Sequence, residues 1–79
     1  MSKASVYFQV ENMTDKKDVQ TIKKELDTLR GVISVSTNAQ TGRVAVDYDT
    51  TGMEQSRIEN RLQKLGYKIL AEKNENHIM

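Results

Sequence analysis

The 79-residue chain contains no cysteine, no proline and no tryptophan. Without cysteine it has no disulfide bond, no thiolate nucleophile and no thiolate ligand for a metal ion. Aromatic residues make up only 5% of the chain, and the single histidine, His77, lies close to the last residue. No pair of side chains suited to acid–base catalysis is evident, so we predict that the protein is not an enzyme.

The chain also lacks an excess of charge of either sign. It contains twelve lysine and arginine residues and eleven aspartate and glutamate residues, which gives a net charge of +1. Dedicated nucleic-acid binders usually carry a clear basic excess. No apolar run approaches the roughly 20 residues of a spanning helix, and the first ten residues lack the long apolar region of a secretory signal. We therefore expect a cytoplasmic protein that binds neither nucleic acid nor a membrane.

A chain of this length has room for one small domain and no second core. We place the domain at residues 1–72 and interpret residues 73–79 as a polar C-terminal tail. The tail contains His77 and Met79, which are potential ligands for copper or nickel. Polar terminal segments tend to fray, so we take these two residues as accidental composition.

Four segments have the pattern of β-strands. Apolar and polar residues alternate along residues 5–11, which is typical of a half-buried strand. A hairpin is predicted from residues 32–38 and residues 43–49, which flank a short turn containing glycine. In the first of these strands, Ile33 and Val35 are expected on one face. A short fourth strand is predicted at residues 67–71.

Two segments between these strands have helical periodicity. From Asp18, apolar residues recur at spacings of three and four, and Gly31 is placed to end this helix in a left-handed conformation. Thr51 and Glu54 have the spacing of a capping box before a second helix, which Gly66 ends. The side chains expected in the core are Val6, Phe8, Val10, Val19, Ile22, Leu26, Ile33, Val46, Ile58 and Leu62.

The predicted order is strand, helix, strand, strand, helix, strand. Right-handed crossovers then give the strand order 4-1-3-2 in an antiparallel sheet with both helices on one face, an α+β ferredoxin-like sandwich. The open face offers Tyr7 alone as an aromatic residue and so lacks the stacking platform of an RNA-recognition domain. The fold by itself does not decide the function, because ferredoxin-like domains serve many.

Six segments together carry a more specific signal. They are VYFQVE at 6–11, NMT at 12–14, IKKEL at 22–26, GVISV at 31–35, TGRVAVDYD at 41–49 and LGY at 65–67. In this order and spacing the chain resembles the heavy-metal-associated (HMA) domain family, which comprises small cytosolic copper chaperones and N-terminal domains of copper-transporting P-type ATPases. The resemblance implies a copper-chaperone-like role in metal homeostasis, through protein–protein contact.

The chain departs from the family at its metal motif, Met-x-Cys-x-x-Cys. The corresponding residues here are Met13, Thr14, Asp15, Lys16, Lys17 and Asp18. Both cysteine positions hold aspartate, whose hard carboxylate does not suit soft Cu(I), so we expect no Cu(I) thiolate carrier and no cofactor. Asp15 and Asp18 suit the N-terminus of a helix, with Asp15 as its cap. The alternative is a weak site in which both ligate a harder divalent ion, with water, a backbone carbonyl or a partner's ligand.

The remaining residues around the motif have structural or docking roles. Met13 is expected to fill the core, and the family places a tyrosine, here Tyr67, beside the motif loop. The resemblance implies that the loop and first-helix surface docks a partner such as a related HMA domain of a metal-transporting ATPase or another metal-homeostasis protein. The basic residues on that surface, which would steer association, are Lys16, Lys17, Lys23 and Lys24.

Overall fold

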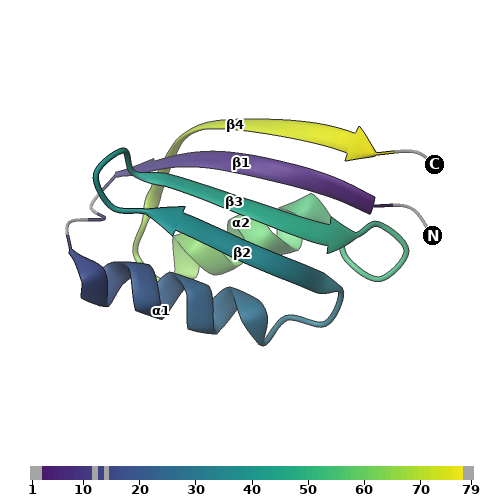
Figure 1. Cartoon of the computed structure of the whole chain (residues 1–79), viewed down its shortest axis with the longest axis horizontal. Coiled ribbons are helices and arrows are strands. Elements are labelled where there is room, and N and C mark those ends of the chain that lie inside the picture. The colour runs from purple at the N-terminus through teal and green to yellow at the C-terminus, as the bar shows by residue number, and fades with distance from the viewer. Residues whose placement is uncertain (1–2, 12, 14, 78–79) are drawn as a thin grey trace.

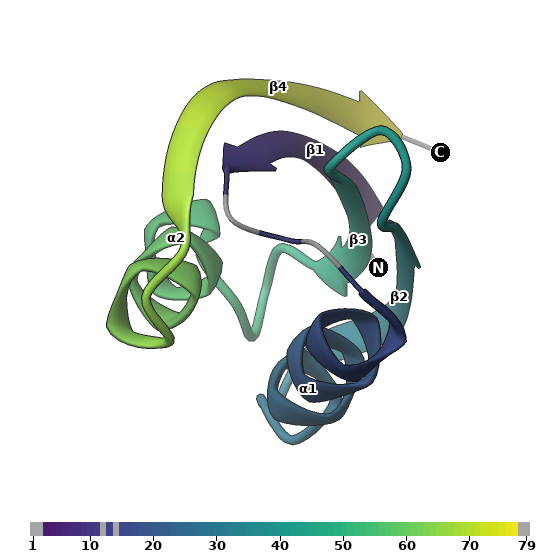
Figure 2. The ribbon, with the colours of Figure 1, turned by 90° about the vertical axis from the view of Figure 1, so that its left-hand side faces the viewer.

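The computed structural model describes residues 3–11, 13 and 15–77, without the side chains of residues 76 and 77. Its elements are β1 (Lys3–Glu11), α1 (Lys16–Asp27), β2 (Val32–Asn38), β3 (Arg43–Asp49), α2 (Gln55–Lys64) and β4 (Lys68–His77). The strands form one antiparallel sheet in the order β2-β3-β1-β4. Both helices lie on the same face of this sheet (Figures 1 and 2). The ferredoxin-like arrangement predicted from the sequence is confirmed.

The core lies between the sheet and the two helices. Strands contribute side chains at every second position and helices at every third or fourth, as the two periodicities require. The fully buried side chains of larger volume are Val6, Phe8, Ile22, Leu26, Val44, Val46, Ile58 and Leu62. Of the predicted core residues, only Val19, which is half-buried, and Ile33 are not buried. None of the helices in the described residues is long and apolar enough to cross a lipid bilayer.

The prediction for Ile33 is wrong. Its side chain is 54% exposed, whereas Val35 is 8% exposed. The pairing of β2 with β3 shifts register between Val32 and Ser34, which indicates a β-bulge at Ile33. An extra residue in one strand interrupts the alternation of side chains, so a count in steps of two across residue 33 fails.

Helix α1 ends earlier than the sequence predicted. It ends at Asp27, and Thr28 follows as C-cap with its Oγ1 donating to the carbonyl oxygen of Glu25 at 2.7 Å. Gly31 has the predicted left-handed conformation, with a φ of +97°, but it lies in the loop beyond the helix. A Cβ atom at Gly31 would lie 2.8 Å from the Cβ atom of Met53, so this close approach of two loops also requires glycine.

The capping box predicted for α2 is wrong as well. The helix follows Glu54, whose side chain makes no capping hydrogen bond to the described residues. Thr51 is turned back instead: its Oγ1 and its backbone N–H donate to Asp49 Oδ1 at 2.6 and 2.9 Å. The bonds from Thr51, its hydroxyl first, lower the pKa of the Asp49 carboxyl. Thr51 therefore hydrogen-bonds to the short side chain of Asp49, two residues upstream, instead of capping the helix.

Strand β4 is longer than the predicted 67–71. It runs from Lys68 to His77 and pairs along the whole of β1, so residues 73–77 continue the sheet rather than form part of a tail. Polar contacts rather than apolar ones hold its second half. Asn74 Nδ2 donates to Tyr48 Oη at 2.7 Å and to Gln55 Oε1 at 2.6 Å. Hydrophobic alternation cannot reveal a strand that is held in this way.

Candidate functional site

The loop between β1 and α1 carries the motif positions. Met13 is 6% exposed and belongs to the core cluster, which confirms its predicted packing role. Thr14 and the preceding Asn12 lie outside the described residues. The buried side chain of Met13 therefore anchors the motif loop to the core. The exposed lysines Lys16 and Lys17 follow it in the first turn of α1.

Asp15 is the N-cap of α1. Its backbone is extended, with φ −148° and ψ −178°, and its Oδ1 accepts a hydrogen bond from the backbone N–H of Asp18 at 3.1 Å. This bond satisfies one of the N–H groups that have no partner within the first turn of a helix. The negative charge also lies at the positive end of the helix dipole. The predicted capping role of Asp15 is confirmed.

Asp18 makes a contact that the sequence did not reveal. Its Oδ1 accepts a hydrogen bond from the hydroxyl of Tyr67 at 2.7 Å. Tyr67 is 8% exposed and lies in the short loop between α2 and β4, so the bond joins the first turn of α1 to the loop that follows α2. Burial, followed by the hydrogen bond to Asp18 and its charge, raises the pKa of Tyr67 to about 12. The phenol therefore stays protonated and acts as a donor throughout the physiological range.

Pairing Tyr67 with Asp18 requires knowledge of the fold, because the two residues are 49 positions apart. The sequence offered two partial signals: a tyrosine where the family places one beside the loop, and an acid where the family has cysteine. Neither signal predicts a hydrogen bond between the two side chains. In the fold, the buried hydroxyl of Tyr67 is the donor and the half-buried carboxylate of Asp18 is the acceptor.

The site does not fit Cu(I), and it offers few ligands for a harder ion. Cu(I) prefers thiolates, and the two motif side chains are carboxylates. One oxygen of Asp15 accepts the cap bond, and one oxygen of Asp18 accepts the bond from Tyr67. The described part of the chain brings no three metal-ligating residues together. The side chain of His77 and all of Met79 lie outside that part.

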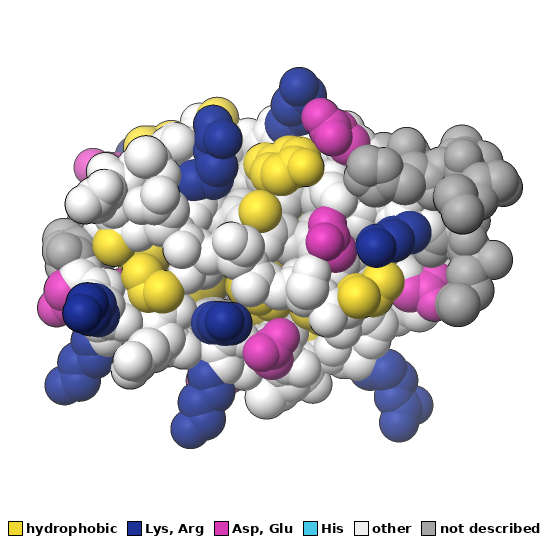
Figure 3. Space-filling model, viewed as in Figure 1, with side chains coloured by type: hydrophobic (Ala, Val, Ile, Leu, Met, Phe, Trp, Pro, Cys, Tyr) yellow, Lys and Arg dark blue, Asp and Glu magenta, His cyan; other side chains and the backbone are white. Residues whose placement is uncertain are grey.

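The lysines predicted to dock a partner are accessible. All four are exposed on α1, and none forms an ion pair with a described residue. They are Lys16, Lys17, Lys23 and Lys24. Figure 3 shows Lys and Arg side chains projecting from the side of the molecule on which α1 lies. These exposed side chains can contact a partner, while Asp18, Glu25 and Asp27 on the same helix reduce its net positive charge.

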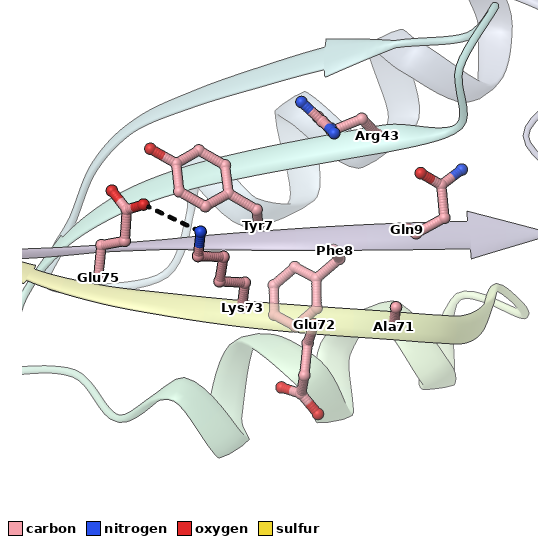
Figure 4. Close-up of a pocket in the computed structure, with 8 residues that line it drawn as sticks. All are labelled: Tyr7, Phe8, Gln9, Arg43, Ala71, Glu72, Lys73 and Glu75. Atoms are coloured by element: carbon pink, nitrogen blue, oxygen red, sulfur yellow. Dashed lines mark ion pairs between the residues drawn. The ribbon is translucent and has the colours of Figure 1, made fainter.

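The open face of the sheet forms a second candidate surface. A hollow of about 580 Å³ lies over β1, β3 and β4, and Figure 4 shows Tyr7 standing over it beside Lys73 and Glu75. Lys73 Nζ lies 3.6 Å from Glu75 Oε1, and the hollow also includes Arg43. The sequence missed the contribution of β4 because its predicted strand ended too early. Among the described residues on this face, Tyr7 offers the one aromatic ring, so the stacking platform of an RNA binder is missing here.

Comparisons with known proteins show what the chain is similar to. The sequence model of the heavy-metal-associated domain family matches residues 7–68. The comparison with curated proteins found no match.

Three similar solved structures differ in how much of their own length is matched. The CopZ metallochaperone has a TM-score of 0.81 at 24% identity, over 84% of this chain and 98% of its own. The water-soluble region of the P-type ATPase CopA from Bacillus subtilis has a TM-score of 0.81 at 29% identity, over 86% of this chain and 45% of its own. A copper binding domain from the P-type ATPase HMA7 has a TM-score of 0.75 at 25% identity, over 92% of this chain and 99% of its own.

Proposed function

The chain belongs to the heavy-metal-associated domain family, and from this we propose that it is a cytoplasmic, non-enzymatic, copper-chaperone-like protein that does not carry Cu(I). It acts instead by contact with a partner protein in metal homeostasis. The fold supports the chaperone-like part of the proposal, since the CopZ metallochaperone superposes on most of the chain. The residues at the motif support the loss of Cu(I) transport.

The hydrogen bond from Tyr67 to Asp18 is the observation that carries the proposal. A Cu(I) carrier of this family needs two thiolates that can pass the ion to another protein. Here the second motif position holds a carboxylate that is tied to a buried phenol at 2.7 Å. The first motif position caps the helix. Both side chains stabilise the protein's own loop, and neither has the soft chemistry that Cu(I) requires.

The exposed lysines of α1 support a docking role for the loop and first helix. The net charge is only +1 for the whole chain, and α1 carries three acidic residues beside its four lysines, so a partner is recognised by the individual exposed lysines rather than by a net charge. Two of the similar structures belong to P-type ATPases, which makes a related HMA domain of a metal-transporting ATPase the proposed partner. A basic surface of this kind changes the rate of association more than the affinity.

Competition for Cu(I) tests the proposal. The parent should fail to remove Cu(I) from a strong chelator, whereas the double variant Asp15→Cys, Asp18→Cys should capture it, because the sequence around these positions resembles the family's. The control Asp15→Ser, Asp18→Ser removes the same carboxylates without adding thiolates and should remain inactive. Stoichiometric capture of Cu(I) by the parent would overturn the proposal.

A further inference from the structure

Strand β2 differs from the rest of the molecule in its charge. No charged residue lies between positions 31 and 42, although 29% of the chain is charged. This stretch contains the whole of β2, which lies at one edge of the sheet and pairs only with β3 (Figure 1). The outer side of β2 therefore presents backbone N–H and C=O groups that have no strand partner within the described residues.

The opposite edge of the sheet is protected in the way that edge strands usually are. Strand β4 carries Lys68, Glu72, Lys73 and Glu75, and charged side chains, lysine above all, discourage the addition of another strand. Strand β2 has no such residue. Its one irregularity is the bulge at Ile33, and from Ser34 onward its pairing with β3 continues without a shift. Of the two edges, β2 is the one open to pairing.

Exposure along β2 agrees with an accessible edge. Ile33 is 54% exposed, and the side chains of Ser34, Ser36 and Asn38 are exposed as well. Large aliphatic side chains gain from contact with a second surface, and short uncharged ones do not obstruct it. The strand thus combines unpaired backbone groups with an apolar side chain and no charge.

We propose that β2 is a self-association surface, at which two copies of the chain pair their β2 strands antiparallel about a twofold axis. The two four-stranded sheets then join into one of eight strands, with the helices of both copies on the same side. A second copy suits this edge because no like charges meet when an uncharged strand pairs with itself. The neighbouring α1 carries four lysines and three acidic residues, so it adds little net repulsion.

Two matched substitutions at the two edges test the proposal. Ile33 on β2 and Leu70 on β4 are exposed to 54% and 55%, so Ile33→Lys and Leu70→Lys make the same chemical change at equal exposure. In a concentration series followed by analytical ultracentrifugation, the parent's mass should rise from 9.0 kDa toward twice that value. Ile33→Lys should weaken dimerisation by roughly tenfold or more, and Leu70→Lys should leave it unchanged.

A second pair of variants and a measurement on the parent keep the test independent of any one variant's folding. Ser36→Lys places two like charges near the twofold axis and should abolish the dimer, whereas Ala71→Lys, an exposed position on β4, should not. In the parent, hydrogen exchange of amides in residues 32–38 should slow as concentration rises. A mass that stays at 9.0 kDa throughout, equal effects at both edges, or slowing confined to residues 68–77 would each overturn the proposal.

Discussion

Helices α1 and α2 pack against the sheet in the same way but begin differently. Each buries two aliphatic residues, Ile22 and Leu26 in α1 and Ile58 and Leu62 in α2. At its start, however, α1 has the capping bond of Asp15, whereas α2 has no side-chain cap among the described residues. The side chain at the first of the two motif positions thus caps α1, a task that no described side chain performs at α2.

The difference shows which contacts hold the loop before α1. An N-cap stabilises a helix by about 1 kcal/mol, and a hydrogen bond to a charged group adds about 1.5–3 kcal/mol. Asp15 and the bond between Asp18 and Tyr67 supply both contributions at the motif loop. The loop is therefore stabilised by the protein's own contacts. The predictions below remove these contacts, beginning with the packing that the two helices share.

The largest effect is expected from the shared packing. Leu26→Ala in α1 and Leu62→Ala in α2 each remove a side chain that is 0% exposed. Each should lower the free energy of unfolding by about 2–5 kcal/mol, because the lost burial is joined by a cavity. Urea titration of both variants measures this. A much smaller loss for only one of them would show that the helices differ in their packing as well as in their starts.

The next effect concerns the phenol of Tyr67. Tyr67→Phe removes the bond to Asp18 and should lower stability at neutral pH by about 1–2 kcal/mol, because the half-buried carboxylate loses its donor. The control Tyr7→Phe removes a phenol from the open face of the sheet and leaves the bond to Asp18 intact. Equal losses in the two variants would show that the bond contributes nothing beyond the loss of a hydroxyl.

The same residue predicts a dependence on pH. The pKa of Tyr67 is raised to about 12, whereas a tyrosine in the unfolded chain ionises near 10. The raised pKa favours the neutral phenol in the folded protein, so its stabilisation is fully present below about pH 10 and is lost as the pH rises toward 12. The parent should lose about 2–3 kcal/mol across this window through Tyr67. Tyr67→Phe should remove that share of the loss, and Tyr7→Phe should retain it.

These contacts mark the limit of what the sequence could predict. Alternation and helical spacing predicted the strands, the helices and most of the core, because burial repeats regularly along a strand or helix, and right-handed crossovers then gave the order of the strands. They failed at Ile33, where a bulge interrupts the repeat. They also failed along the second half of β4, where Asn74 holds the strand through polar contacts. The bond between Tyr67 and Asp18 was missed because it depends on how the first turn of α1 and the loop after α2 meet in space.

A smaller effect is expected at the helix starts themselves. Asp15→Ala should lower stability by about 1 kcal/mol, whereas Asp15→Asn should be almost neutral, because asparagine is an equally good N-cap. Glu54→Ala is the matched change at the start of α2, where no capping bond is lost, and should be nearly silent. Urea unfolding of the three variants measures the differences. If Glu54→Ala costs as much as Asp15→Ala, the two helices do not differ at their starts.

The smallest expected effect is that of divalent metal ions. If Asp15 and Asp18 are structural, the melting temperature of the parent should not change with micromolar Mn²⁺, Ca²⁺, Zn²⁺ or Ni²⁺, nor with a chelator. A site that bound one of these ions in the folded state would raise the melting temperature as the ion is added. Asp15→Asn keeps the cap but removes a carboxylate charge, so it separates the two roles. A rise in the parent that is absent in Asp15→Asn would establish a carboxylate metal site at the motif and overturn the structural role. A rise that persists in Asp15→Asn and disappears in His77→Ala would place the metal at the end of the chain and leave the motif aspartates with the roles their contacts indicate.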